Sequence, residues 1–190
     1  TRLIPFMAPP HAPDTVVPGK PTTFRVLDDF NTEPTEYMVT VPPEYHPLRS
    51  YPTILALHDG NGPKKAIDLW SAEAARHGFI VVAPEYTLPN QPRNYRYSVS
   101  EHAAIELALR DARKRFAIDS DRVFLAGDML GGNVAIDFGP SHPDLFAGIA
   151  SVSGLPAKYA YAYRKNTGTV PQYFVLGDLA PGSKEVMFEM

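Results

Sequence analysis

From Pro52 onward, short apolar runs alternate with segments of helical periodicity, and this alternation restricts the fold more than any other feature of the sequence. A continuous apolar run such as residues 79–83 is typical of a parallel strand that is covered on both faces. Strands and helices that follow one another without a break indicate an α/β fold with a mostly parallel sheet. The expected strands are residues 53–58, 79–83, 122–126, 146–152 and 170–176, and the expected helices are residues 64–77, a stretch beginning at the capping box of Ser98 and Glu101, and residues 131–138.

The first quarter of the chain differs from the rest in composition. Eleven of the 20 prolines lie at or before Pro52, and six of them fall within residues 1–21, a density that excludes a helix there. Two β-rich runs follow, at residues 23–27 and 37–41, and suggest an antiparallel pair of strands. We therefore expect an extended proline-rich arm over residues 1–22 and one α/β domain over residues 23–190.

The composition argues against several classes of function. A net charge of -3 provides no attraction for polyanions, so nucleic acid is not an expected partner. The absence of cysteine excludes disulfides, thiolate nucleophiles and cysteine-bound zinc, and no histidine spacing indicates a metal site, so we expect neither metal nor cofactor. The longest apolar stretch, residues 79–83, is far shorter than the roughly 20 residues of a membrane-spanning helix. No feature assigns the chain to a compartment.

The most specific motif lies between residues 123 and 135. A strand runs into a turn that begins at Gly127, has Met129 at its centre and ends at Gly131, and a helix follows directly through Gly132. This Gly-x-x-x-Gly turn resembles the nucleophile elbow of the α/β-hydrolase fold, in which flanking glycines permit a strained turn that lifts the central side chain above the sheet.

The resemblance extends over most of the chain, including residues 57–62, 79–86, 141–146 and 171–177. The chain resembles the bacterial esterase and peptidase branch of the α/β-hydrolase family, near the dienelactone hydrolases and feruloyl-esterase-like proteins. The resemblance implies an α/β-hydrolase-like sheet flanked by helices, and an ancestral serine-dependent hydrolysis of esters or peptides. It also implies an oxyanion-hole-like arrangement that involves Asp59, Gly60 and Leu130.

The departures from this family concern the catalytic residues. Met129 stands where the family carries serine, and a thioether has no proton to give up and is a weak nucleophile. Asp178 is the candidate acid, although the resemblance places the acid nearer Ala180. The family's triad runs in the order nucleophile, acid, histidine. All the histidines precede Asp178, so the expected general base is missing; they are His11, His46, His58, His77, His102 and His142.

The resemblance also implies that the sheet is incomplete. Eight strands are usual in the resembled fold and seven are expected here, so the last strand, the last helices and the histidine-bearing loop are predicted to be missing after residue 190. A fragment of a longer protein and a naturally shortened relative both fit this prediction. A fragment would explain the missing histidine and would leave Met129 unexplained.

Each of these features has a simpler interpretation. Met129 could be an ordinary core methionine at the end of a strand, although the clustered glycines then lack a reason. His58 and Asp59 could form a dyad, but neighbours in a strand point to opposite faces, which favours a structural role for His58. Asp128 could act as an aspartyl nucleophile, but it lies one residue before the centre of the turn.

Two loops rich in aromatic and basic residues are expected near the carboxyl ends of the strands, where ligands bind in open α/β sheets. Their tyrosines could stack on an aromatic or sugar ester, or could merely cover the sheet edge. The candidate ligand-lining residues are Tyr86, Tyr95, Tyr97, Tyr159 and Tyr163.

Taken together, the residues predict a non-catalytic relative of serine esterases and peptidases. One alternative is a working hydrolase with an unusual nucleophile or with its missing parts supplied elsewhere. A second is a binding or interaction module that uses the tyrosine-rich loops. The strand at residues 170–176 would end the sheet with an unprotected edge, so we also expect self-association through it, or coverage of it by the N-terminal arm.

Overall fold

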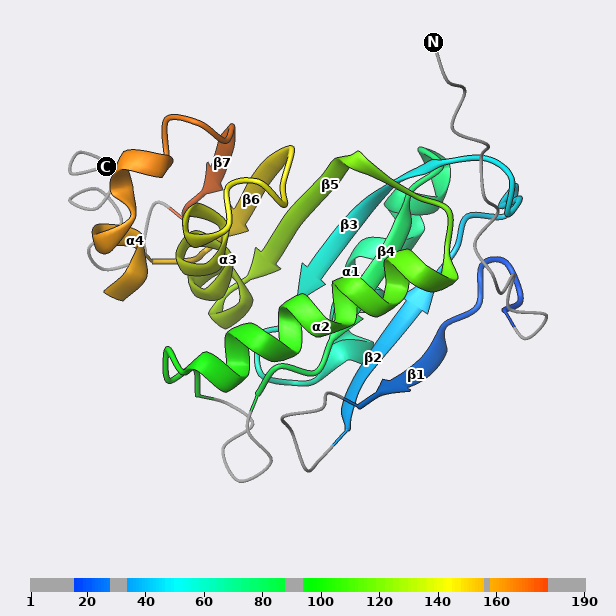
Figure 1. Ribbon diagram of the computed structural model, residues 1–190, viewed down its shortest axis with the longest axis horizontal. Coiled ribbons are helices and arrows are strands. Elements are labelled where there is room, and N and C mark those ends of the chain that lie inside the picture. The colour runs from blue at the N-terminus through cyan, green and yellow to red at the C-terminus, as the bar shows by residue number, and fades with distance from the viewer. Residues whose placement is uncertain (1–15, 28–33, 88–93, 156–157, 178–190) are drawn as a thin grey trace, which may run out of the picture.

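The structure of the protein is a computed structural model. It describes residues 16–27, 34–87, 94–155 and 158–177. Seven strands form one sheet in the order β1-β2-β4-β3-β5-β6-β7 (Figure 1). The first two strands are antiparallel to their neighbours and the other five run parallel. The strands are β1 (Thr22–Val26), β2 (Thr35–Thr40), β3 (Tyr51–Leu57), β4 (Ile80–Pro84), β5 (Ile118–Asp128), β6 (Gly148–Val152) and β7 (Gln172–Val175).

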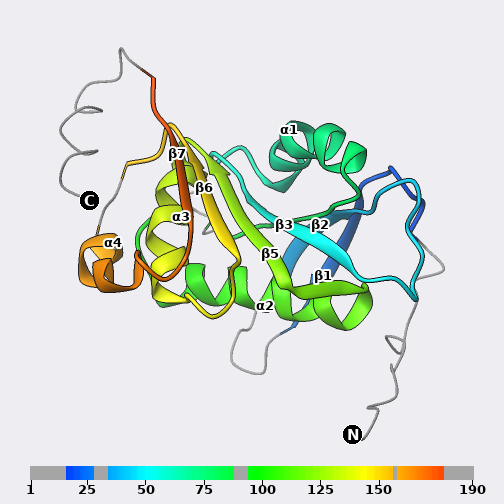
Figure 2. The same cartoon turned by 90° about the horizontal axis from the view of Figure 1, so that it is seen from above.

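Helices cover the two faces of the sheet unequally. The long helices α2 (Val99–Arg115) and α3 (Leu130–Ser141) pack on one face, with the short α4 (Lys158–Ala162) beside α3 and a 3₁₀ turn, η1 (Arg164–Asn166), after it. On the other face, α1 (Pro63–Arg76) packs against β2, β3 and β4 (Figure 2). Among the described residues no helix covers β5, β6 and β7 on the α1 side.

The core lies between the sheet and these helices. Leu55 and Leu125 on the sheet pack with Ile105 of α2 and Phe138 of α3, all of them buried. Because successive side chains of a strand alternate between faces, Ala56 and its neighbours contribute to a second cluster beneath α1. The parallel strands are therefore apolar on both faces, as the sequence pattern indicated.

A buried hydrogen bond attaches the antiparallel strands to α2. The Tyr37 hydroxyl on β2 donates to Oδ2 of Asp111 at 2.6 Å, and the Arg115 guanidinium donates to the same oxygen at 2.7 Å. Burial, and then the hydrogen bond to Asp111, raise the pKa of Tyr37 well above its usual value. The ring of Tyr37 stacks on Phe24 of β1, with 5.5 Å between the ring centroids.

The expected α/β fold with seven strands is confirmed, and the differences lie at element boundaries. β5 begins at Ile118, four residues before the expected start, because the polar residues 119–121 extend the strand beyond the covered part of the sheet. α3 continues to Ser141 and includes Pro140 in its last turn. Neither α4 nor η1 was expected within the tyrosine-rich loop.

Candidate functional site

Met129 occupies the tip of a strained turn between β5 and α3. Its backbone has φ 50° and ψ -112°, a conformation that non-glycine residues rarely adopt. The turn is held by the Met129 N–H, which donates to the carbonyl of Val152 on β6 at 2.8 Å. The Met129 side chain is 58% exposed, so it projects into solvent and is not part of the core.

The three glycines around this turn are required by close backbone approach. A Cβ atom on Gly127 would lie 2.1 Å from the carbonyl oxygen of Gly131, and one on Gly131 would lie 2.2 Å from that of Leu57. A Cβ atom on Gly132 would lie 2.9 Å from the Cα atom of Gly154. The first turn of α3 therefore packs directly on the backbone of β3 and of the segment after β6.

The loop after β3 satisfies most of its polar groups within itself. The Gly60 N–H donates to Nδ1 of His58 at 3.1 Å, and Oδ1 of Asp59 accepts from the Asn61 N–H at 3.1 Å. Burial acts to raise the pKa of Asp59, but hydrogen bonds from Asn61 outweigh it, so the pKa is lowered. Leu130 is the first residue of α3, where backbone N–H groups have no partner within the helix. Of the three residues expected to form an oxyanion hole, Leu130 adjoins Met129, whereas the Gly60 N–H points at His58.

His58 is enclosed on all sides. Its side chain has no exposed area, and its Nδ1 accepts from the N–H groups of Gly60 and Gly62, at 3.1 and 3.3 Å. The ring proton therefore lies on Nε2, which donates to Oε1 of Glu85 at 3.2 Å. Burial acts to raise the pKa of Glu85, but hydrogen bonds from His58 and Thr87 lower it below its usual value. With both ring nitrogens occupied, His58 positions the loop and has no nitrogen left to act as a general base.

The remaining described histidines lie away from Met129. His46 precedes β3 and His77 precedes β4, at the amino ends of the strands, opposite the elbow. The ring of His102 lies against Phe138, with 5.1 Å between centroids, and His142 stacks on the same ring. Phe138 is nine residues along α3 from Met129, which corresponds to about 13 Å. His11 and the candidate acid Asp178 lie outside the described residues, and no described histidine presents an unoccupied ring nitrogen to Met129.

Two of the expected ligand-lining tyrosines turn inward. Tyr86 and Tyr95 are only 1% and 8% exposed, and burial raises the pKa of both hydroxyls above the usual range. The Tyr86 hydroxyl donates to the carbonyl of His58 at 2.5 Å, and the Tyr95 hydroxyl donates to Oδ2 of Asp137 at 3.2 Å. The expectation that Tyr86 and Tyr95 line an open site needs correction, because both rings are buried in the core. Each hydroxyl is hydrogen bonded there to a partner that is far away in the sequence.

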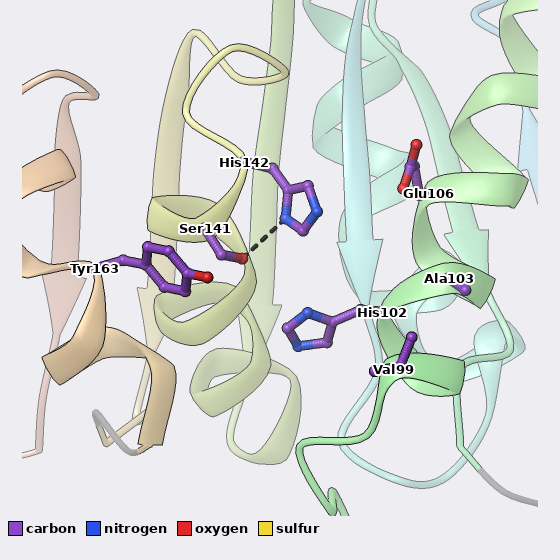
Figure 3. Close-up of a pocket in the computed structure, with 7 residues that line it drawn as sticks. All are labelled: Val99, His102, Ala103, Glu106, Ser141, His142 and Tyr163. Carbon is purple, nitrogen blue, oxygen red and sulfur yellow. Dashed lines mark hydrogen bonds between the residues drawn. The ribbon is translucent and has the colours of Figure 1, made fainter.

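The other three tyrosines differ in their surroundings. Tyr97 is half-buried against Tyr95, with 4.4 Å between ring centroids. Tyr159 belongs to α4, but its side chain is not among those that the structure describes. Tyr163 is 41% exposed and lines a pocket of about 300 Å³ between α2 and the C-terminal end of α3 (Figure 3). This pocket and the buried Asp137 were not predicted, although a carboxylate within the apolar run of residues 134–138 was a signal that could have been noticed.

Two further findings concern metals and membranes. Over the described ranges, no group of three or more histidine, aspartate or glutamate side chains could hold a metal ion. In the same ranges, no helix combines the length and apolar character needed to cross a membrane.

Comparisons with known proteins concern the sequence and the fold as a whole. No family model matches the sequence. The chain is 27% identical over 202 residues to "Putative esterase NocK" of Nocardia uniformis subsp. tsuyamanensis, a match that covers 92% of this chain and 58% of NocK. The chain thus spans somewhat more than half the length of that relative.

Solved structures resemble the chain over most of its length. S-formylglutathione hydrolase (FrmB) from Staphylococcus aureus superposes with a TM-score of 0.69 at 14% identity, covering 90% of this chain and 84% of the hydrolase. The poly(3-hydroxybutyrate) depolymerase LpqC from Bordetella parapertussis gives a TM-score of 0.64 at 19% identity, with 88% and 68% covered. The fold is that of the α/β-hydrolases. The chain is similar in sequence to a protein described as a putative esterase and in fold to solved hydrolases, and its Met129 lies on the turn between a central strand and the following helix.

Proposed function

We propose that this chain keeps the scaffold of a serine esterase but does not hydrolyse esters. The observation that carries the proposal is Met129, exposed at the tip of the turn where the resembled family places its serine. A thioether sulfur has no proton for a base to remove, and it cannot form the acyl ester through which serine hydrolases act.

The surroundings of Met129 support the same proposal. His58 is the described histidine nearest to Met129 in the fold. Both of its ring nitrogens are hydrogen bonded, Nδ1 to the N–H groups of Gly60 and Gly62 and Nε2 to Glu85. His102 and His142 lie beside Phe138, well along α3. A serine introduced at position 129 would therefore find no base among the described residues.

The experiment is hydrolysis of a short activated ester such as p-nitrophenyl butyrate. We expect a rate no higher than that of an unrelated protein with the same numbers of lysines and histidines, because exposed amines and imidazoles cleave such esters slowly. Loss of nucleophile and base together costs on the order of 10⁶ in turnover in a working protease. Saturable hydrolysis that survives repurification would overturn the proposal.

The Met129→Ser variant tests the missing base separately. We expect no stoichiometric labelling by a fluorophosphonate probe, because a serine without a base stays a weak nucleophile at neutral pH. Labelling of this variant would show that a base acts on position 129, and the alternative of an active hydrolase with parts supplied elsewhere would then be preferred.

A second candidate function is ligand binding at the elbow without turnover. The strained backbone at Met129 costs roughly 1–3 kcal/mol, and such strain tends to persist at functional sites. Met129 and Leu155, which is 39% exposed, offer apolar surface near the first turn of α3, where the Leu155 N–H donates to Asn133. Saturable binding of a non-hydrolysable ester analogue, weakened in Met129→Asp, would support this function.

A further inference from the structure

The pocket between α2 and the C-terminal end of α3 is separate from the elbow. Ser141 and His142 lie at the opposite end of α3 from Met129, about 18 Å along the helix. The pocket volume of about 300 Å³ is at the lower end of the range for small-molecule sites. Its lining residues are Val99, His102, Ala103, Glu106, Ser141, His142 and Tyr163 (Figure 3).

His142 presents a hydrogen-bond acceptor to this pocket. Its Nδ1 lies 3.1 Å from the carbonyl oxygen of Phe138, which can only accept, so the proton of the neutral ring lies on Nδ1. The Ser141 hydroxyl donates to the same carbonyl at 2.7 Å. The Ser141 hydroxyl oxygen also lies 2.9 Å from Nδ1. The Nε2 lone pair has no hydrogen-bond donor among the described residues, and Figure 3 shows this edge of the ring facing the space between α3 and α2.

Glu106 adds a negative charge to the same pocket. It lies four residues after His102 on α2, so the two side chains share one helix face. Its carboxylate is exposed and forms no ion pair with any described residue. The pocket therefore combines an unpaired carboxylate with an imidazole acceptor, and no lysine or arginine among the described side chains lines it.

A buried hydrogen-bond network holds the walls of the pocket in place. Asp137 on α3 has no exposed area; its Oδ2 accepts from the Tyr95 hydroxyl and its Oδ1 accepts from the Ala160 N–H of α4 at 2.8 Å. Because Tyr95 gives its only proton to Asp137, the 2.5 Å contact between Tyr95 and His102 is a donation from Nε2 of His102. One carboxylate thus fixes both tyrosine-bearing segments around the pocket.

We propose that this pocket binds a small organic ammonium ion. The ammonium group has only N–H donors and a positive charge, so it can donate to Nε2 of His142 and pair with the carboxylate of Glu106. A short apolar or aromatic stem would lie against Val99 and Ala103 on the α2 side of the pocket. A carboxylate ligand would be repelled by Glu106, and a neutral alcohol would lose the ion pair. This proposal does not depend on the function proposed for the elbow.

The test is an NMR titration of the isotope-labelled chain with benzylamine hydrochloride, benzyl alcohol and benzoate at neutral pH. We expect saturable shifts at residues lining the pocket with benzylamine, severalfold weaker binding of benzyl alcohol, and none of benzoate. His142→Ala and Glu106→Gln should each weaken benzylamine binding by about twofold to fivefold, as expected for one partly exposed hydrogen bond or ion pair.

Matched controls are His77→Ala and Glu73→Gln on or next to α1, which remove the same groups on the other face of the sheet and should leave the affinity unchanged. Met129→Ala should also leave it unchanged, which separates this pocket from the elbow. Equal affinity for all three probes, or benzylamine binding that both pocket variants leave intact, would overturn the proposal. The proposal would also be overturned if the chain does not bind benzylamine but binds Zn²⁺ through His142, because the pocket acceptors would then be metal ligands.

Discussion

At the scale of single residues, the shape of the elbow depends on its glycines and not on the side chain at its tip. The first turn of α3 can approach β3 only because Gly131 leaves room for the Leu57 carbonyl. The strained conformation of Met129 is a consequence of that approach. The same backbone can therefore carry either a serine or a methionine at the tip.

We predict that Gly131→Ala destabilises the chain by about 2 kcal/mol or more, because the new Cβ would meet backbone atoms that cannot move independently. The measurement is the free energy of unfolding in urea. Gly168→Ala is the control, since a Cβ there would meet nothing within 4 Å. Equal effects of the two substitutions would contradict the proposed packing of α3 on β3.

Glu85 gives a prediction about pH. Its pKa is lowered in the folded chain, so its ionised form stabilises the fold above the unfolded value of about 4.3, and this contribution is lost as the pH falls through the folded pKa. Glu85→Gln should therefore destabilise the chain at pH 7 more than at pH 4. The side chain is 35% exposed, so solvent screening limits the difference to about 1 kcal/mol.

Urea unfolding of both proteins at pH 7 and pH 4 measures this difference. Glu73→Gln removes a charge at an exposed site on α1 and serves as the control. A destabilisation by Glu85→Gln that is larger at pH 4 than at pH 7 would show that the His58 to Glu85 contact does not lower the pKa of Glu85.

Single residues also show where sequence reasoning succeeds. The glycines at 127, 131 and 132 could be interpreted from the sequence because their spacing within one turn carries the constraint. The inward direction of Tyr95 could not, because its partner Asp137 is 42 residues away and comes into contact only when α3 packs beside α2. The pocket was missed for the same reason.

At the scale of elements, local signals were reliable. The capping box at the start of α2 was expected from four residues, and Ser98 and Glu101 form both of its hydrogen bonds. The boundaries expected for β3 and β5 were less accurate. The first residues of the two strands, Tyr51 and Ile118, pair with each other beyond a register shift between Tyr51 and Thr53. Residues 119–121 of β5 are polar, so no apolar pattern predicted that the strand begins at Ile118.

The attachment of the antiparallel strands to α2 can be tested at Tyr37. We predict that Tyr37→Phe lowers the free energy of unfolding by about 1 kcal/mol, because Asp111 loses a buried hydrogen bond but keeps Arg115. Tyr161→Phe, at a side chain that is 54% exposed, should change stability by less than about 0.5 kcal/mol. If Tyr37→Phe has no larger effect than this control, the hydrogen bond does not hold β2 to α2.

At the scale of the whole molecule, the sheet is protected unevenly. β7 follows β6 at the end of the strand order and contains only four residues. Register pairs Ala150 with Tyr173 and Val152 with Val175, so these side chains share the face that no described helix covers. Tyr173 is 68% exposed and Val175 is 40% exposed. An apolar face beside an edge with which no described strand pairs favours association with another strand.

We predict that the chain self-associates through β7, or that the N-terminal arm expected over residues 1–22, of which residues 1–15 lie outside the described residues, covers this edge. Light scattering after size-exclusion chromatography should show a mass that rises with concentration, and Tyr173→Lys should lower it, because a lysine on an edge strand opposes pairing. Leu69→Lys on α1, at a side chain that is 53% exposed, introduces the same charge on the part of the molecule that packs against β2, β3 and β4, and should leave the mass unchanged. If the chain is monomeric, deleting residues 1–15 should raise its mass, because removal of the cover would expose the edge. A chain that stays monomeric at high concentration both before and after this deletion would contradict both forms of the prediction.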